Sequence, residues 1–265
     1  MGGFLLQRAR VALVVGAPAA LAACSSGPLS VGDNRIPISL PDSGPDIGAG
    51  GTMDAAGDVA DALAPPTPGD LISITASCAK QISGGLLARR PNGTVDVAIC
   101  QLSNAIFWTS GLAVMCAGKT TTTCNPTTDT QFQPTTTAKD SNGDSLDAAA
   151  LPYVEVSAPS SLFDYTNPMW GLKMGTVVAV VNRNKTLLEY GILGTVGQKD
   201  IIGDASYAMA SSLGVNPDPA MGGTGGGITY IAFTGPSAVV SVNENHDEAV
   251  RLGEVAAAAL VQAGK

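Results

Sequence analysis

Histidine is almost missing from this sequence of 265 residues, which holds only His246. A zinc site usually draws on several histidine or cysteine ligands, and the five cysteines show no Cys-x-x-Cys spacing. A catalytic serine is no better supported, because Ser206 in Ala-Ser-Tyr has no Gly-x-Ser-x-Gly sequence around it. The sequence therefore argues against a zinc centre and a serine hydrolase, and it predicts no metal and no cofactor.

Positive charge is also scarce. Lysine and arginine number 14 against 22 aspartates and glutamates, which gives a formal net charge of −8 and a pI near 4.5. That balance argues against nucleic acid as a partner. An acidic surface would attract a cationic polymer, but ordinary solubility explains the same charge.

Long apolar runs are absent, since the longest, residues 11–23, is too short to span a membrane. It follows Arg8 and Arg10, so residues 1–23 are predicted to be a signal peptide. Leu21-Ala22-Ala23-Cys24 is typical of a bacterial lipoprotein cleavage site, with Cys24 lipidated; the alternative is a plain secretory peptide. We expect an exported protein, either anchored at the cell envelope through Cys24 or secreted. Ser25 after the cysteine favours the outer membrane.

Residues 24–70 form the next predicted segment. Proline, glycine and serine dominate it, as in Pro41-Asp-Ser-Gly-Pro45 and Pro65-Pro-Thr-Pro-Gly69, and little apolar surface lies between them. Such a segment cannot bury enough surface to offset the entropy of ordering it. We interpret it as a linker, and residues 71–265 as a single folded domain.

Four cysteines remain in that domain: Cys78, Cys100, Cys116 and Cys124. An even number in an exported chain predicts disulfides. Three pairings are possible, and we favour Cys116–Cys124 with Cys78–Cys100.

Short β-branched runs outnumber helical patterns in the domain. The expected strands are 94–101, 105–115, 154–156, 176–181, 186–193 and 228–233, and the expected helices are 205–213 and 247–263. Many strands with few helices predict a mainly β (α+β) fold, a single β-barrel-like domain with peripheral helices and disulfides. We expect a six-stranded barrel.

Two short motifs invite functional readings that their details do not support. Asp140-Ser-Asn-Gly-Asp144 resembles a calcium loop, but its glycine comes too early for an EF-hand, which indicates a solvated turn. Gly222-Gly-Thr-Gly-Gly-Gly227 lacks the lysine of a P-loop and precedes a strand pattern, so we expect a loop beside a groove.

Several motifs are spread over the domain: Gly203-Asp-Ala-Ser-Tyr207, Gly222-Gly223, the strand Ile228–Phe233, Phe107-Trp108, Cys116-x-Gly118, Leu146–Val154 and Gly171-x-Lys173-x-Gly175. Together they resemble one family, the fungal-type chitosanases of glycoside hydrolase family 75. The resemblance extends over roughly residues 78 to 260. It implies endo-hydrolysis of β-1,4-linked glucosamine chains, with a chitosan-like polysaccharide as partner.

The resemblance also implies a catalytic pair that this sequence has altered. In the family, the Asp of Gly-Asp-x-Gly-Pro and the Glu of Gly-Glu-Ala-Ser-Tyr would be the two carboxyls of an inverting glycosidase. Here Thr195 and Asp204 stand at those positions. The family segment Asp-Ile-Asp-Cys-Asp-Gly is residues 113–118 here, and its three acids are Ala, Met and Ala. The acids are lost while the cysteine and glycine remain, so we expect a weakened or lost active site.

Other residues are candidates on weaker grounds. Trp108, Tyr153 and Tyr207 could offer faces for sugar stacking, and Lys173 lies in a matching motif, so these four are the predicted substrate-binding residues. Four carboxylates elsewhere could replace the missing acid: Asp200, Glu189, Asp164 and Glu155. None of these four occupies a motif position.

Two hypotheses of different class follow. The first is a divergent chitosanase-like hydrolase that uses Asp204 with a second acid not yet identified. The second is a non-catalytic surface lipoprotein that binds a carbohydrate or another partner. A second carboxyl group within about 10 Å of Asp204 across an open cleft would favour the enzyme. A cleft lined only by Thr195, Met115 and alanines would favour the binding protein.

Overall fold

The computed structural model describes residues 64–264. The predicted signal peptide 1–23, Cys24 and most of the predicted linker 24–70 lie outside the described residues. Within the described part, no helix combines the length and the apolar character needed to cross a membrane.

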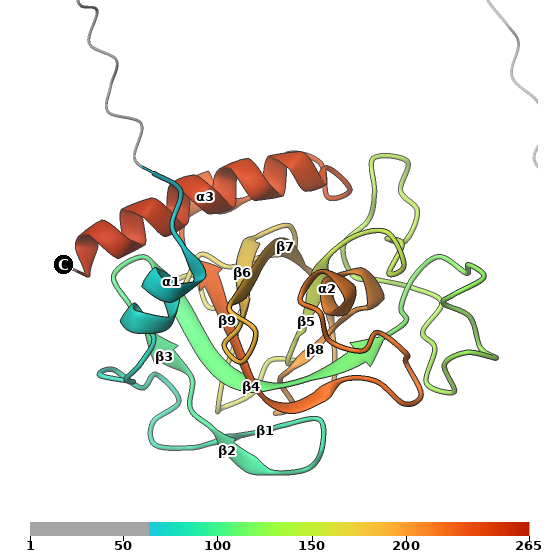
Figure 1. Ribbon diagram of the computed structural model, residues 1–265, viewed down its shortest axis with the longest axis horizontal. Coiled ribbons are helices and arrows are strands. Elements are labelled where there is room, and N and C mark those ends of the chain that lie inside the picture. The colour runs from blue at the N-terminus through green and yellow to red at the C-terminus, as the bar shows by residue number, and fades with distance from the viewer. Residues whose placement is uncertain (1–63, 265) are drawn as a thin grey trace, which may run out of the picture. The chain divides into compact units, whose positions relative to one another are not determined.

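The described chain contains nine strands and four short or long helical segments, and β-structure dominates it (Figure 1). The strands are β1 Ala88–Arg89, β2 Val95–Val97, β3 Cys100–Gln101, β4 Ala105–Met115, β5 Tyr153–Val156, β6 Val177–Asn182, β7 Leu187–Val196, β8 Asp204–Ser206 and β9 Thr224–Phe233. The helices are α1 Pro68–Ile74, α2 Tyr207–Ser212, the 3₁₀ turn η1 Pro236–Ala238 and α3 His246–Ala263.

Six of these strands close into a barrel, in the order β4-β8-β5-β7-β6-β9, and the pairing of β9 with β4 completes the ring. β3 adds to the outer side of β4. Two pairs are parallel, β4 with β8 and β5 with β7, and the others are antiparallel. The mainly β fold with a six-stranded barrel is therefore confirmed.

Alternate residues of the barrel strands pack on opposite faces of the sheet. One set, including Phe107, Ile231 and Phe233, joins a cluster that contains Leu71 of α1 and Leu260 of α3. These two helices therefore cover the outer face, as Figure 1 shows for α3 above the strands. The other set packs in a second cluster and includes Ile106, Trp108, Val178, Val180, Leu193 and Tyr230. Both faces are apolar, which explains why β6 is buried at every position.

The strand predictions are close to the observed bounds, and β4 agrees at both ends. The expected strand 94–101 is broken, because residues 98–99 separate β2 from β3. α1 begins at Pro68, inside the segment predicted as linker, and is capped by Thr67, whose hydroxyl accepts a hydrogen bond from the Asp70 backbone N–H.

The expected helix 205–213 is wrong at its start. Asp204–Ser206 pair with β4 and β5 as strand β8, and the helix begins only at Tyr207. Ser206 is the reason for the sharp change, since its hydroxyl accepts hydrogen bonds from the backbone N–H groups of Tyr153 in β5 and Met209 in α2. Asp204 therefore stands on a barrel strand, not at a helix end.

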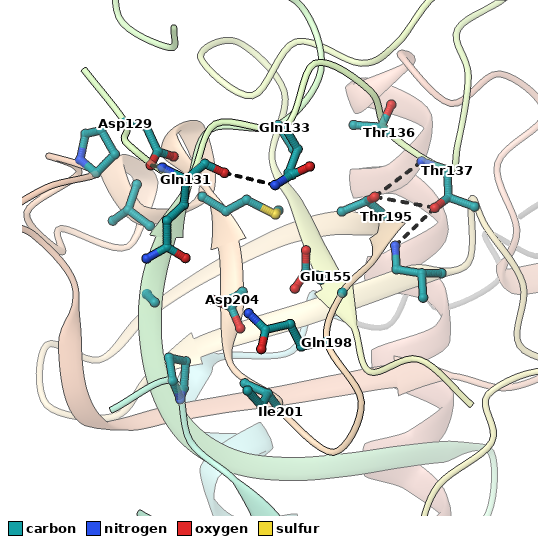
Figure 2. Close-up of a pocket in the computed structure, with 18 of the residues that line it drawn as sticks. Asp129, Gln131, Gln133, Thr136, Thr137, Glu155, Thr195, Gln198, Ile201 and Asp204 are labelled. Carbon is teal, nitrogen blue, oxygen red and sulfur yellow. Dashed lines mark hydrogen bonds between the residues drawn. The ribbon is translucent and has the colours of Figure 1, made fainter. Parts of the chain in front are cut away.

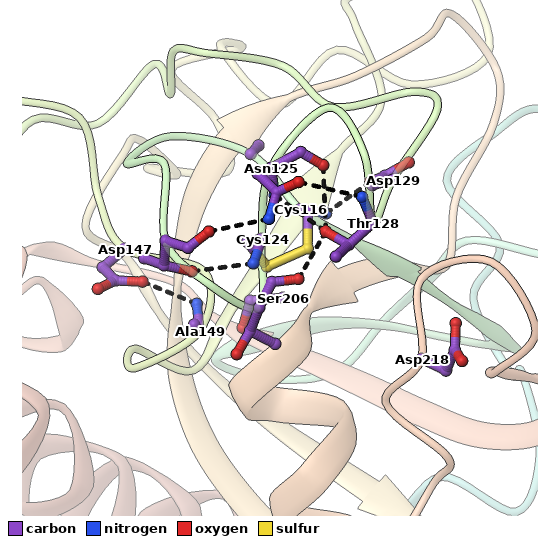
Figure 3. The surroundings of a disulfide bond; sticks show 12 residues. Cys116, Cys124, Asn125, Thr128, Asp129, Asp147, Ala149, Ser206 and Asp218 are labelled. Carbon is purple, nitrogen blue, oxygen red and sulfur yellow. Dashed lines mark hydrogen bonds between the residues drawn. A yellow bond between two sulfur atoms is a disulfide. The ribbon is translucent and has the colours of Figure 1, made fainter.

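Both favoured disulfides are confirmed: Cys78–Cys100 and Cys116–Cys124. The second joins the residue after β4 to the loop that follows it (Figure 3). The backbone N–H of Cys116 also donates to the Asp129 carboxyl at 3.1 Å. The disulfide and this hydrogen bond together hold the start and the middle of the long segment between β4 and β5.

Candidate active site

Four strands of the barrel place one residue each in a single row across the sheet. Ala113 of β4 pairs with Asp204 of β8. The antiparallel pair of Val154 with Ala205 puts Glu155 of β5 opposite Asp204. Glu155 in turn pairs with Thr195 of β7. The row therefore reads Ala113, Asp204, Glu155, Thr195, from segments far apart in the sequence.

All four residues of the row line one cleft of about 830 Å³. β4, β5 and β7 end at this cleft and β8 begins there, while the loops around residues 129–139 and 196–201 form its walls. The lining also includes Met115 and Ala117. A second hollow of about 350 Å³ shares Pro91, Ala113 and Gly222 with the first, so the open surface continues along β4.

Glu155 and Asp204 face the same space from neighbouring strands, with Gln198 beside them (Figure 2). Both carboxyls are only partly exposed, yet within residues 64–264 neither makes a hydrogen bond or an ion pair. Such groups normally cost free energy unless a partner compensates them. Two of them side by side in a cleft are therefore evidence of a functional site.

Gly197 makes the position of Glu155 possible. A Cβ atom at residue 197 would come within 1.6 Å of Glu155 Oε1. The second glycine of the family's Gly-Asp-x-Gly-Pro motif is thus retained as Gly197, and the carboxyl of Glu155 on β5 occupies the space beside it.

The surroundings change the acidity of both carboxyl groups. Burial, and after it the negative charge of Asp204, raise the pKa of Glu155 from its ordinary 4.5 to about 7. Burial raises the pKa of Asp204 from 3.8 to about 6. Since the two groups share one site, the ionised Asp204 helps to keep the proton on Glu155. Between about pH 6 and 7, one carboxylate therefore faces one carboxylic acid.

Thr195, a predicted catalytic residue, lies in the cleft but is tied to its wall. Its side-chain oxygen accepts a hydrogen bond from the Thr137 backbone N–H at 3.3 Å, and the Thr137 hydroxyl accepts one from the Val196 N–H at 3.2 Å. The residue is 5% exposed. The structure therefore gives Thr195 a part in holding the loop over the cleft (Figure 2).

The four predicted substrate-binding residues lie away from the cleft. Trp108 and Tyr153 are 1% and 0% exposed; the Trp108 ring stacks on Tyr230, and the Tyr153 hydroxyl donates to the Ala117 carbonyl. Tyr207 packs at the start of α2 and Lys173 is exposed before β6. In the described part of the chain, no aromatic side chain lines the cleft. Contact of these residues with a sugar stays a prediction that their positions do not support.

Of the four spare carboxylates, only Glu155 lines the cleft. Glu189 Oε1 lies 3.5 Å from Nε2 of His246, the first residue of α3, and Asp164 binds its own loop through Thr166. Asp200 lies in the loop before β8 with a positive φ of 62°. One sequence signal did mark Glu155: it is the single charged residue in the otherwise apolar strand Tyr-Val-Glu-Val.

Two carboxyl groups that face each other in an open cleft are the arrangement that most glycoside hydrolases use. Among residues 64–264, no group of histidine, cysteine, aspartate and glutamate side chains could hold a metal ion. The family model of the fungal chitosanase of glycosyl hydrolase group 75 matches residues 112–258, more than half of the chain. The chain belongs to this family. No curated protein matches it.

The raised pKa of Glu155 has a consequence for stability. Between about pH 4.5 and 7 the folded state holds the Glu155 proton while the unfolded state releases it, so the free energy of unfolding falls as pH rises through this range. Glu155→Gln removes the titration. We expect it to raise the free energy of unfolding at pH 8 by at most about 3 kcal/mol and to have little effect at pH 4.

Urea denaturation of the two proteins at pH 4, 6 and 8 measures this difference. The exposed Glu254 of α3 provides the control, and Glu254→Gln is expected to change stability by less than about 0.5 kcal/mol at each pH. A Glu155→Gln effect that is the same at pH 4 and pH 8 would contradict the prediction.

Proposed function

We propose that this domain hydrolyses β-1,4-linked amino-sugar polysaccharide with Glu155 and Asp204 as its two catalytic carboxyl groups. The observation that carries the proposal is their position: adjacent in the row, partly buried, free of protein partners among residues 64–264, and open to the cleft. The open surface that continues past Ala113 toward Gly225 suits an extended chain, which supports cleavage within a polymer.

The pKa values support different roles for the two groups. Glu155, with its pKa raised to about 7, holds a proton near neutral pH and can act as the general acid. Asp204, with its pKa at about 6, is the group that ionises first. Both are in their working states between about pH 6 and 7, where an optimum is expected.

The spacing of the row favours a double displacement. Neighbouring strands lie about 4.8 Å apart, so positions 195 and 204, with β5 between them, are about 10 Å apart. Residues 155 and 204 are directly opposite, where Cβ atoms are about 5 Å apart. Carboxyl groups at the wider positions would leave room for the water of an inverting enzyme, whereas directly opposite residues suit the short carboxyl separation of retaining enzymes.

In the first step, an Asp204 oxygen attacks the anomeric carbon while the Glu155 proton passes to the leaving oxygen, and the glycosidic bond breaks. In the second step, the Glu155 carboxylate takes a proton from water, and the water oxygen displaces Asp204 from the anomeric carbon. Each residue returns to its starting protonation state.

A binding protein is the competing reading, and one observation favours it. Met115, Ala113, Ala117 and Thr195 all line the cleft, where the resembling enzymes carry acids at the corresponding positions. Glu155 favours the enzyme, because two adjacent carboxyl groups whose pKa values are raised to about 7 and about 6 suit an acid and its partner near neutral pH.

Substitution of either carboxyl group tests the catalytic pair. Glu155→Gln and Asp204→Asn are each expected to lower kcat on partially N-acetylated chitosan by about 10²–10⁴-fold, because each removes a proton-transfer or nucleophilic group without changing its size. Thr195→Val removes only a hydroxyl group and its hydrogen bond, so its loss should not exceed about tenfold.

The reducing ends released per minute measure these rates. Asp164→Asn, outside the cleft, is the matched control and should cut at the rate of the unchanged protein. If Glu155→Gln cuts as fast as this control, Glu155 is not part of the pair; if the unchanged protein does not cut at all, the binding protein is the better reading.

The anomeric form of the first products tests the spacing argument. A double displacement retains the β-configuration, so proton NMR of a digest in its first minutes should show the β-anomer before mutarotation produces the α-anomer. An initial α-anomer, together with inactive Glu155→Gln, would keep the pair but assign Asp204 to activating a water molecule.

We further propose that the chain is exported and anchored to a membrane through a lipid on Cys24. The support is the sequence alone: the basic and apolar residues of segment 1–23 and the Leu-Ala-Ala-Cys ending. Cys24→Ala should move the full-length protein from the membrane fraction to the soluble fraction of the envelope. Equal amounts of both proteins in the membrane fraction would contradict the anchor.

A further inference from the structure

The cleft carries few charges although the chain as a whole is acidic. Besides Glu155 and Asp204, its ionisable lining residues are Asp129 and Lys139. Asp129 is 7% exposed, and its two oxygens accept the backbone N–H groups of Cys116 at 3.1 Å and Gln131 at 2.8 Å. That carboxylate holds the wall of the cleft in place, whereas Lys139 adds a positive charge to the lining.

Amide and hydroxyl groups make up the rest of the polar lining. Three glutamines, Gln131, Gln133 and Gln198, point carboxamides at the cleft beside the threonines of residues 135–137 (Figure 2). Within residues 64–264, the carboxamides of Gln131 and Gln198 make no hydrogen bond to the protein. A carboxamide both donates and accepts, so it can pair with the N–H and the carbonyl of an acetamido group.

The apolar lining comes from the end of β4 and the residues just after it. Ala113, Met115 and Ala117 present methyl and thioether groups where the resembling chitosanases have carboxylates. An acetamido methyl gains from contact with such a surface. An ammonium group gains nothing from contact with methyl and thioether groups, and it loses part of its hydration when it is brought against them.

We infer that the cleft selects β-1,4-linked sugars whose 2-amino groups are N-acetylated, in preference to the polycationic glucosamine chain expected from the resemblance. The inference rests on the proposed function, because the same cleft binds the polymer in both. It concerns the charge at each sugar position, while the proposed function concerns the two carboxyl groups that cut.

Two hexasaccharides of equal length separate the alternatives. The fully N-acetylated hexamer of β-1,4-glucosamine should be cut with a kcat/KM about tenfold higher than the unacetylated hexamer, at a pH below the amine pKa where the latter is charged. A higher kcat/KM on the unacetylated hexamer would overturn the inference and leave the catalytic pair intact.

One substitution in the wall should move the preference. Gln131→Glu keeps the size of the side chain and adds a carboxylate to the exposed rim, so the ratio of the two kcat/KM values should shift toward the unacetylated hexamer by about fivefold. Gln262→Glu makes the same change on the exposed face of α3 and should leave the ratio as it was. A shift of the same size with Gln262→Glu would mean that net charge, and not the cleft, sets the preference, which counts against the inference.

Binding gives a readout that does not depend on turnover. Calorimetry with Glu155→Gln should rank the acetylated hexamer above the unacetylated one even if the protein cuts neither. If the protein cuts no glycan but the two affinities rank as expected, only the proposed hydrolysis is contradicted. Equal or reversed affinities, or no binding of either hexamer, would overturn the selectivity.

Acetylated β-1,4-linked amino sugars occur in chitin-type chains and in the glycan strands of peptidoglycan. In the latter, N-acetylglucosamine alternates with N-acetylmuramic acid. Digestion of isolated glycan strands beside the acetylated hexamer distinguishes the two sources. Cleavage of either supports the inference, and the source is the one with the higher kcat/KM.

Discussion

The hydroxyl group of Ser206 holds together the part of the barrel on which the site depends. It accepts hydrogen bonds from the backbone of β5 and of α2 and donates one to the Leu151 carbonyl at 2.8 Å. These contacts fix β8, only three residues long, between β4 and β5. The position of β8 closes the ring and sets the row that joins Asp204 to Glu155. A shift of one residue would turn the Asp204 side chain to the other face of the sheet.

Most of the strands could be predicted from the sequence, because an apolar β-branched run between turn residues can be recognised without knowing its partner strand. The sequence was not sufficient for the row. Glu155 and Asp204 become neighbours only through pairing between segments about fifty residues apart, and the local pattern of residues in either segment does not identify its partner strand. The wrong start of the helix after Asp204 has a similar cause: Ala205 and Ser206 suit a helix locally, and the backbone partners on β4 and β5 decide for a strand.

The cleft can keep two acidic side chains even though the family's motif positions have lost theirs, because Glu155 comes from a different strand. Thr195 stands directly beside Glu155 across the parallel pair of β5 and β7. Like charges at such positions repel each other, so an aspartate at 195 and a glutamate at 155 would compete for one site. Threonine at 195 avoids a further negative charge beside Glu155, and its hydroxyl group accepts a hydrogen bond from the Thr137 backbone.

The space beside Gly197, which the Glu155 carboxyl occupies, gives the cleft one more property. Glu155 packs against Gly197 and, within residues 64–264, makes no hydrogen bond, so its carboxyl is free to pair with a polar group of a ligand. A sugar hydroxyl or a glycosidic oxygen completes a polar network that the folded chain leaves open. Any small polyol can offer the same hydroxyl groups. We therefore expect glycerol and sucrose, common in storage buffers, to compete with a substrate for this carboxyl.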